Sequence, residues 1–318
     1  GQFNPEGRTG FFRRRPEEIE AGGRFVFILV RAQEQRYSVR SMCTSLSVSE
    51  SGYYKWKRNR TRPKPWQLLL AEIHAILAEH PDNNNYGIER MMIALEQRGI
   101  IRSYSTVKRA MKKGNLLHES RRSPDGLTKA DKKADRPDNI IKQDFTASRP
   151  DVKWLTDITQ TQCRDGILYI APVFDCYRGE IVSLAMDTNM KKNLCIKAIS
   201  DAYRLRSPGA GVIIHSDAGS QYTSRAYRQI LGHFHAIQSM SDVAKCYDNA
   251  RMESWFATLK KEKIYKLDTG NMSVEEVKQE VWRYTFAYYN TLRITTATED
   301  GYPPSVYNGK EADRKSVA

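Results

Sequence analysis

The stretch that most constrains the fold is a short apolar run that ends at an acid. Residues 211–214, Gly-Val-Ile-Ile, have the length and character of a buried strand, and His215-Ser216-Asp217 follows them directly. Open α/β sheets hold their functional groups at the carboxyl ends of such strands. The sequence therefore predicts an α/β domain in which Asp217 stands at the edge of the sheet.

Two further acids stand in comparable settings. Asp157 interrupts the β-prone run 152–159. Glu253 begins the periodic segment 253–262, which predicts a helix with Glu253, Phe256, Ala257 and Lys260 on one face. We interpret Asp157, Asp217 and Glu253 as one acidic triad, with Lys260 two helical turns after Glu253. The alternative is that each acid is a surface or helix-capping residue.

A carboxylate triad suits one kind of chemistry. Hard divalent cations such as Mg²⁺ prefer oxygen ligands and keep several waters, so a few carboxylates are enough to bind them. Two such ions about 4 Å apart hold the attacking and leaving oxygens of an in-line phosphoryl displacement. A site of this kind needs no cysteine, no histidine ligand and no covalent nucleophile.

The sequence around these acids resembles the DDE transposases of bacterial insertion sequences, of the OrfB type related to retroviral integrases. Thirty-five residues lie between Asp217 and Glu253, the spacing of that family. The resemblance covers roughly residues 25 to 308. The matching segments are Trp154-Leu155-Thr156-Asp157-Ile158-Thr159, His215-Ser216-Asp217-Ala218-Gly219-Ser220-Gln221-Tyr222, Asp248-Asn249-Ala250, Leu259-Lys260-Lys261-Glu262 and Tyr288-Tyr289-Asn290-Thr291.

The resemblance implies a fold and a reaction. The fold is α/β, with a ribonuclease-H-like catalytic core of five mixed strands and flanking helices, preceded by all-α helix-turn-helix domains. The activity is nicking of the element's 3′ ends, followed by strand transfer through a circular intermediate and integration. Asp157, Asp217 and Glu253 would be the catalytic and metal-binding residues, holding two Mg²⁺ ions for which Mn²⁺ substitutes.

Proline-rich and polar segments of the sequence divide the chain into predicted domains. Pro63-Lys64-Pro65 separates two helical stretches, and a polar, charged segment precedes the alternating strand and helix signals. The predicted domains are a leader or junction at 1–23, a first helix-turn-helix unit at 24–62, a second at 63–117, a linker at 118–150, the catalytic core at 151–268, and a C-terminal helix and tail at 269–318.

The net charge of +14 is concentrated in the front half of the chain. Residues 1–150 carry 29 Lys and Arg against 17 Asp and Glu, whereas the rest carries 22 against 20. This asymmetry indicates a DNA-binding arm on a catalytic body. The resemblance implies double-stranded DNA as partner, namely the terminal inverted repeats and the target, and a homo-oligomer, dimer or larger, with an OrfA protein or fused OrfA segment.

Several residues are candidates for contacting DNA. Lys55, Lys57 and Arg58 fall in the first helical unit and Lys108, Arg109 and Lys112 in the second. For each of them a solvated helix face is the alternative. Lys260 is a candidate for the terminal DNA of the element, with an exposed lysine as the alternative. Asn249, and Ser220 or Gln221, would position the strand or a metal-bound water, with local capping as the alternative.

The five cysteines and the apolar runs indicate the compartment. The cysteines are odd in number and contain no Cys-x-x-Cys, which is typical of a reduced cytosolic protein. No run approaches a membrane span and no signal peptide is visible, so no membrane is expected. A bacterial cytoplasmic location, on the nucleoid, follows from the resemblance.

Two Ser-x-x-Glu patterns predict helix starts. Ser47 and Glu50 form a candidate capping box for a helix that begins after Ser47, and Ser273 and Glu276 form another for a helix over 274–291. The tail beginning Arg293-Ile294-Thr295-Thr296 departs from the commoner Arg-x-His ending of the family. A role for a histidine there is therefore not carried over.

Two other functions remain open at this point. A transposase descendant without activity could bind DNA as a repressor or inhibitor. A ribonuclease-H-like nuclease could cut without strand transfer. The intact triad argues against the first, and the paired helical units at the front argue against the second.

Overall fold

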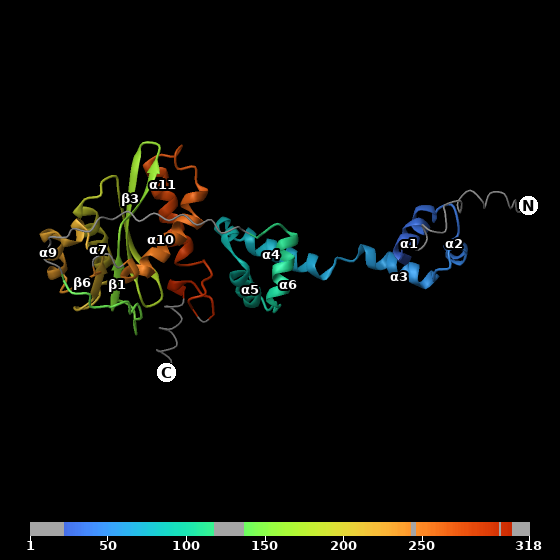
Figure 1. Cartoon of the computed structure of the whole chain (residues 1–318), viewed down its shortest axis with the longest axis horizontal. Helices are drawn as coiled ribbons and strands as arrows, with labels where there is room; N and C mark the ends of the chain where they lie inside the picture. Colours follow the sequence, from blue (N-terminus) through green and yellow to red (C-terminus); the bar gives the residue numbers. More distant parts are fainter. Residues whose placement is uncertain (1–21, 118–136, 243–245, 299, 307–318) are drawn as a thin grey trace, which may run out of the picture. The chain divides into compact units, whose positions relative to one another are not determined.

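The computed structural model describes residues 22–117, 137–242, 246–298 and 300–306. The chain divides into two compact units, residues 1–69 and 70–318, each of which is described by itself (Figure 1). The leader predicted at 1–23 lies almost wholly outside the described residues. So does the first part of the predicted linker, 118–136. In the described part of the chain, no helix has the length and apolar character needed to cross a membrane.

The first unit contains three short helices around a small core. Tyr53 is fully buried there, and the ring of Phe27 meets it edge-on at a centroid distance of 6.0 Å. Val30, Met42 and Cys43 complete the buried cluster. The helices are α1 (Gly22–Gln33), α2 (Val39–Ser45) and α3 (Glu50–Thr61).

One of the two predicted capping boxes, at Ser47 and Glu50, lies in the first unit. Helix α3 begins at Glu50, and its N-cap is Ser49, whose hydroxyl accepts from the Gly52 amide at 3.0 Å. Ser47 instead has φ of 54°, in the left-handed region. The capping box predicted from Ser47 is therefore wrong, because the chain still turns there and Ser49 takes the cap.

The second unit begins with helices that pack on one another. Ile73, Met91 and Leu95 are buried between them, together with Val107 and Met111. Exposed basic side chains occupy the opposite face of the last of these helices. The elements are α4 (Pro65–Ala78), which crosses the boundary between the units, η3 (Pro81–Asn85), α5 (Ile88–Gln97) and α6 (Tyr104–Lys113).

A mixed sheet forms the centre of the second unit. Its first strand runs antiparallel to β3 and parallel to β5, and β5 runs parallel to β6. Strand β4 pairs with the other edge of β3. The strands are β1 (Lys153–Thr156), β2 (Thr159–Cys163), β3 (Gly166–Asp175), β4 (Glu180–Asp187), β5 (Ile213–Ser216) and β6 (Ile237–Met240).

Strands β1 and β2 are two halves of one strand. Both pair with β3 in the same register, from Trp154 opposite Asp175 to Cys163 opposite Gly166. The break falls at Asp157, which stands opposite Pro172 in that register. Proline has no N–H to donate, so it cannot support strand pairing there. The sheet therefore has five strand positions, as the sequence predicts, with an interruption that frees Asp157 from regular pairing.

Helices cover both sides of this sheet. Figure 1 shows α7 and α9 on one side and α10 and α11 on the other. The apolar core against α7 includes Trp154, Val173, Ile214 and Ala198, all buried. The helices are α7 (Lys192–Arg206), α8 (Ser220–Thr223), α9 (Arg225–His233), η4 (Cys246–Asn249), α10 (Ala250–Glu262), η5 (Ile264–Lys266), α11 (Val274–Trp282) and the π-helix η6 (Arg283–Tyr289).

The predicted C-terminal helix starts as expected but changes type. Ser273 accepts from the Glu276 amide and Glu276 reaches back to Ser273, so this capping box is confirmed. From Arg283 the helix widens into η6. The side chains of η6 then reach three different neighbours. Tyr284 bonds Glu262, Tyr288 stacks on His80 at 4.5 Å, and Tyr289 donates to the Gly179 carbonyl.

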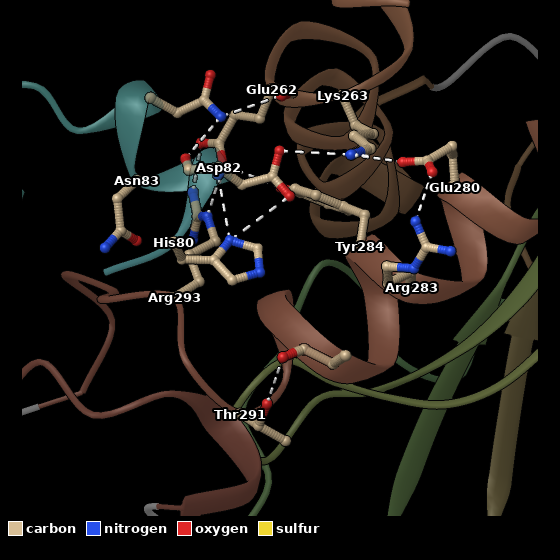
Figure 2. Close-up of polar contacts among 12 residues, drawn as sticks. His80, Asp82, Asn83, Glu262, Lys263, Glu280, Arg283, Tyr284, Thr291 and Arg293 are labelled. Atoms are coloured by element: carbon tan, nitrogen blue, oxygen red, sulfur yellow. Dashed lines mark hydrogen bonds and ion pairs between the residues drawn. The ribbon is translucent and has the colours of Figure 1, made fainter. Parts of the chain in front are cut away.

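A polar network ties the helices at 70–113 to the sheet domain. Glu262, at the end of α10, accepts from Arg90 of α5 at 2.7 Å, and its carbonyl accepts from Asn85 at 3.0 Å. Lys263 pairs with Glu280 at 2.8 Å and lies 3.6 Å from Asp82. Figure 2 shows Lys263 between the carboxylates of Asp82 and Glu280, with Glu262 close by. The second helical stretch is therefore docked through charged side chains.

The described part of the predicted linker also belongs to this domain. The Ile140 amide donates to the Ser239 hydroxyl at 3.0 Å, and Ile141 is buried. Lys153 donates to Asp144 at 2.6 Å. Residues 138–144 are thus bonded to strands of the sheet, so this part of the predicted linker is not a free tether.

Candidate functional site

The two aspartates of the triad come from neighbouring parallel strands. Strand β1 pairs with β5 in a register that ends with Leu155 opposite His215. Asp157 and Asp217 each lie two residues further on, at the carboxyl ends of their strands. Parallel strands deliver side chains at the same level to the same edge, so this register brings the two carboxylates together. Both side chains are half-buried.

The electrostatics of Asp157 reflect this closeness. Burial raises its pKa well above the ordinary range, and the charges of Asp217 and Glu253 raise it further. A hydrogen bond from the Ile158 amide and the charge of Lys260 act in the opposite direction. The effects that raise the pKa are the larger, so the Asp157 carboxyl holds its proton more tightly than an ordinary aspartate does.

The turn after β5 fixes Asp217. One oxygen of its carboxylate accepts from the Gly219 amide at 3.1 Å. A Cβ at position 219 would lie 3.1 Å from that oxygen and 3.1 Å from Oε1 of Gln221. An alanine at position 219 would therefore require the side chains of Asp217 and Gln221 to shift by a few tenths of an ångström.

His215 supports the site from below and is not a ligand. Its Nδ1 lies 2.8 Å from the Ser239 hydroxyl and its Nε2 lies 3.1 Å from that of Ser241, which ties β5 to the segment after β6. Burial lowers the pKa of this histidine to about 4, so the ring is neutral near pH 7. His215 is part of the His-Ser-Asp motif, but the local sequence does not show that it bonds two serines on a distant segment.

Asp248 is a positioning residue that sequence reasoning missed. It is buried and accepts from the side chains of Asn139 and Gln143 at 2.9 and 3.0 Å, and from the Asp242 amide at 3.1 Å. These bonds fix the start of α10, which carries Glu253. The acid belongs to the Asp-Asn-Ala motif, but its side-chain partners lie more than a hundred residues earlier, so no local signal identifies them.

Glu253 and Lys260 come from α10. Glu253 is exposed in the first turn, and Lys260 is half-buried two turns later. The charges of both act on Asp157. Within the described ranges, no three His, Cys, Asp or Glu side chains are gathered closely enough to hold a metal ion. The structure therefore pairs the two aspartates, with Glu253 within electrostatic range but outside such a cluster.

Asn249 does not cap α10. It occupies the N-cap position without a side-chain cap bond, so the capping alternative does not hold. Its side chain is buried, and both polar atoms have no hydrogen-bond partner among the described residues. Of the other two candidates, Gln221 donates to the Met190 carbonyl at 3.2 Å, and Ser220 is exposed.

The basic candidates of the front helices differ in availability. Lys57 is held by Glu34 at 2.7 Å, which removes it from an open basic surface. Lys55 and Arg58 are exposed on α3. On α6 the exposed basic side chains lie opposite the buried face, and they are Lys108, Arg109 and Lys112.

Comparison with known proteins gives a consistent result. Residues 147–246 match the integrase core domain family. The chain is 32% identical over 254 residues to the insertion element IS600 31 kDa protein of Shigella sonnei, with 79% of this chain and 92% of that protein covered. It is 29% identical over 269 residues to transposase InsF for insertion sequence IS3A of Escherichia coli (strain K12), with 84% and 93% covered.

Two solved viral structures are among those that resemble the chain. The simian T-cell lymphotropic virus intasome, in complex with the PP2A regulatory subunit B56 gamma, matches with a TM-score of 0.41 and 16% identity, covering 64% of this chain and 70% of that one. The HTLV-2 integrase catalytic core domain, in complex with magnesium, matches with a TM-score of 0.36 and 17% identity, covering 48% and 95%.

Proposed function

Because this chain belongs to the DDE transposases of bacterial insertion sequences, which carry an integrase core domain, we propose that it nicks the 3′ ends of its own element and joins them to other DNA. DNA transposition is its general activity. The proposal extends this to the individual steps: 3′-end nicking, strand transfer through a circular intermediate, and integration. It acts on DNA in the bacterial cytoplasm.

The observation that carries the proposal is the pairing of Asp157 with Asp217. Two carboxylates delivered by adjacent parallel strands repel one another, and burial adds to the cost of their charge. Such an arrangement destabilises the protein unless cations offset it. Paired carboxylates of this kind are expected where a protein binds a cation.

The donor set fits divalent metal ions. All three acids supply oxygen, which is the ligand atom that Mg²⁺ prefers, and the neighbouring histidine is engaged by two serines. Asp157 and Asp217 would hold one ion between them. Glu253 would complete a second position with one of the aspartates. Bound there, two Mg²⁺ ions, or Mn²⁺ in their place, supply Lewis-acid stabilisation of a phosphoryl transfer.

The reaction has two steps of the same kind. In nicking, a water oxygen attacks phosphorus, the P–O3′ bond breaks, and the strand is left with a 3′-hydroxyl and a 5′-phosphate. In joining, that 3′-hydroxyl attacks a second phosphodiester, forms a new P–O bond and displaces the 3′-oxygen of the attacked strand. Nicking turns one phosphodiester into a phosphomonoester, whereas joining exchanges one phosphodiester for another. In each step the attacking oxygen loses a proton and the leaving 3′-oxygen gains one. The site must therefore orient one phosphate at a time.

The DNA is held mainly by the front helices in this proposal. The exposed basic groups of α3 and α6 would contact phosphates of the terminal repeats, each half reading part of the end as a helix-turn-helix. The active form would be a homo-oligomer, dimer or larger, on two ends. An OrfA protein or fused segment would supply further recognition.

A nicking and joining assay tests the proposal. The full chain is incubated with labelled DNA that carries the ends of its element, with Mg²⁺, with Mn²⁺ and with chelator. The expected products are 3′-hydroxyl nicks and joined ends in either metal, and neither product in chelator. Binding without nicking would instead identify an inactive DNA-binding regulator. Nicking without joining would identify a nuclease.

A further inference from the structure

A cleft of about 530 Å³ lies along α10, the helix that carries Glu253. Its walls come from the start of α5, one face of α10 and the tail after η6. None of the three acids lines it, so it is a separate feature of the surface. However, Arg251 and Ser254, which do line it, flank Glu253 in the sequence of α10. One helix thus faces both the acids and the cleft.

The lining of the cleft is strongly basic. It contains four arginines, Arg90, Arg178, Arg251 and Arg293, against one acid, Glu89. Two of the arginines share the carboxylate of Glu262, which offsets one positive charge. Hydroxyl groups of Ser254, Thr258, Thr295 and Thr296 add donors around the same space. A positive excess with many hydroxyls suits oxygen anions.

Three N–H groups at this cleft have no hydrogen-bond partner within the described part of the chain. They are Nη1 of Arg90, Nε of Arg251 and Nε1 of Trp255, and Trp255 is only 2% exposed. A buried donor left without a partner costs about 1–3 kcal/mol. Buried donors without a partner are few in folded proteins, and these three belong to residues that line the same cleft.

The start of α5 adds backbone donors. Gly87 is the N-cap of this ten-residue helix and provides no side-chain cap. Gly87, Ile88, Glu89 and Arg90 all line the cleft. The amides of a helix's first turn have no partner inside the helix, and together with the helix dipole they favour a bound anion. Backbone and guanidinium donors therefore converge on one space.

We propose that this cleft binds phosphates of the DNA backbone, in the strand segment that runs along α10 next to the nicking site. The proposal rests on the proposed function, because the ligand is the same DNA. Guanidinium groups and uncapped helix amides bind phosphate with charge-assisted hydrogen bonds. The cleft would also connect the DNA-binding helices with the nicking site, since one wall belongs to the α4–α6 helices and the other to α10.

The test measures the salt dependence of DNA binding with chemistry switched off. The full chain with Asp157→Asn is titrated, in chelator, against a short fluorescein-labelled DNA duplex at several salt concentrations. Arg251→Gln removes a cleft charge, and Ser254→Glu adds a negative charge at an exposed cleft position without disturbing the packing. Matched controls are Arg204→Gln on α7 and Gln229→Glu on α9, both exposed in the structure.

Each lost phosphate contact reduces the slope of log affinity against log salt by about 0.9. We expect Arg251→Gln and Ser254→Glu each to reduce the slope by about that amount, while the controls match the parent. Slopes equal to the parent in both cleft variants would overturn the proposal. So would tighter binding of a polyglutamate peptide than of DNA, because it would assign the cleft to a carboxylate partner.

The experiments distinguish a failure of the cleft proposal from a failure of the proposed nicking reaction. The binding experiment contains no metal and no active acid pair, so its result is independent of nicking. If the slopes do not change but the wild-type chain nicks its ends, only the cleft assignment is lost. If the slopes change but no nicking occurs in Mg²⁺, the cleft remains a DNA site and the proposed reaction is wrong.

Discussion

Arg293 donates two hydrogen bonds to Glu262, from Nε and Nη2 to the two carboxylate oxygens, each 2.8 Å long. Arg90 and the Tyr284 hydroxyl donate to the same carboxylate at 2.7 and 2.9 Å. Figure 2 labels Glu262, Tyr284 and Arg293 in this cluster. Glu262 is 7% exposed. Its bonds and charge pairs with Arg293, and then with Arg90, hold its pKa at about 2 against the cost of burial. The residue is the junction of α5, α10 and the tail.

Glu262→Gln is expected to destabilise the chain by about 3–5 kcal/mol, because it leaves buried guanidinium groups without their counter-charge. Urea denaturation followed by circular dichroism measures the change. Glu275→Gln is the matched control, since Glu275 is exposed on α11 and its nearest cation lies 3.4 Å away. An unchanged unfolding midpoint in Glu262→Gln would show that the junction does not stabilise the fold.

The same variant predicts a pH dependence. The folded pKa of Glu262 is lowered from 4.5 to about 2, so its contribution is present above pH 4.5 and is lost as pH falls toward 2. The stability difference between wild type and Glu262→Gln should therefore shrink over that interval. A difference that stays constant from neutral pH to pH 2 would contradict the assigned ion pairs.

Asp157→Asn is expected to stabilise the metal-free chain by about 1–3 kcal/mol, since it removes a charge that burial and Asp217 both disfavour. Added Mg²⁺ should raise the melting temperature of the wild type and have little effect on the variant. Thermal denaturation with and without Mg²⁺ measures both effects. Asp187→Asn, at an exposed strand end, is the control. A destabilised Asp157→Asn would count against a repulsive acid pair.

Gly219→Ala is expected to lower the nicking rate about tenfold, which corresponds to about 1.4 kcal/mol in the activation free energy. The added Cβ would meet an Asp217 oxygen at 3.1 Å and displace the carboxylate. Gly209→Ala is the control, because a Cβ there meets nothing within 4 Å. Nicking rates on labelled ends compare the two, and equal rates would show that the carboxylate tolerates the shift.

Lys260→Ala is expected to weaken engagement of the terminal nucleotides more than overall binding, because the front helices still hold the DNA. Lys260 acts electrostatically on Asp157, which places it near the acid pair. Crosslinking of a terminal nucleotide to Lys260→Cys, together with nicking by Lys260→Ala, measures the effect. The absence of a crosslink with unchanged nicking would make Lys260 an ordinary surface residue.

Local sequence signals predict features that depend only on residues close by in the chain. The Ser-x-x-Glu pattern is right at Ser273, where the helix starts in the open, and wrong at Ser47, where a left-handed turn delays the helix to Glu50. The strand through Asp157 is visible as a β-prone run. The sequence also shows Asp157 interrupting that run, but not that Pro172 stands opposite the break, because Pro172 lies on the partner strand.

The acids of the candidate site could be found in the sequence, but what holds them could not. Asp157 and Asp217 follow apolar runs, and strand ends are where sites occur. Glu262 instead depends on Arg90, 172 positions earlier, and Asp248 depends on Asn139, 109 positions earlier. Helix or strand periodicity in the sequence cannot predict contacts between residues so far apart. The change from α11 to a π-helix at Arg283 is likewise set by tertiary partners.

The most direct test of the account replaces each acid in turn with its neutral isostere. Asp157→Asn, Asp217→Asn and Glu253→Gln are compared with wild type for nicking of labelled element ends in Mg²⁺, and DNA binding is measured in parallel. We predict that each variant binds DNA nearly as well as wild type and loses nicking and joining. Near-normal turnover in any one of the three would contradict the assignment of that acid to the metal site.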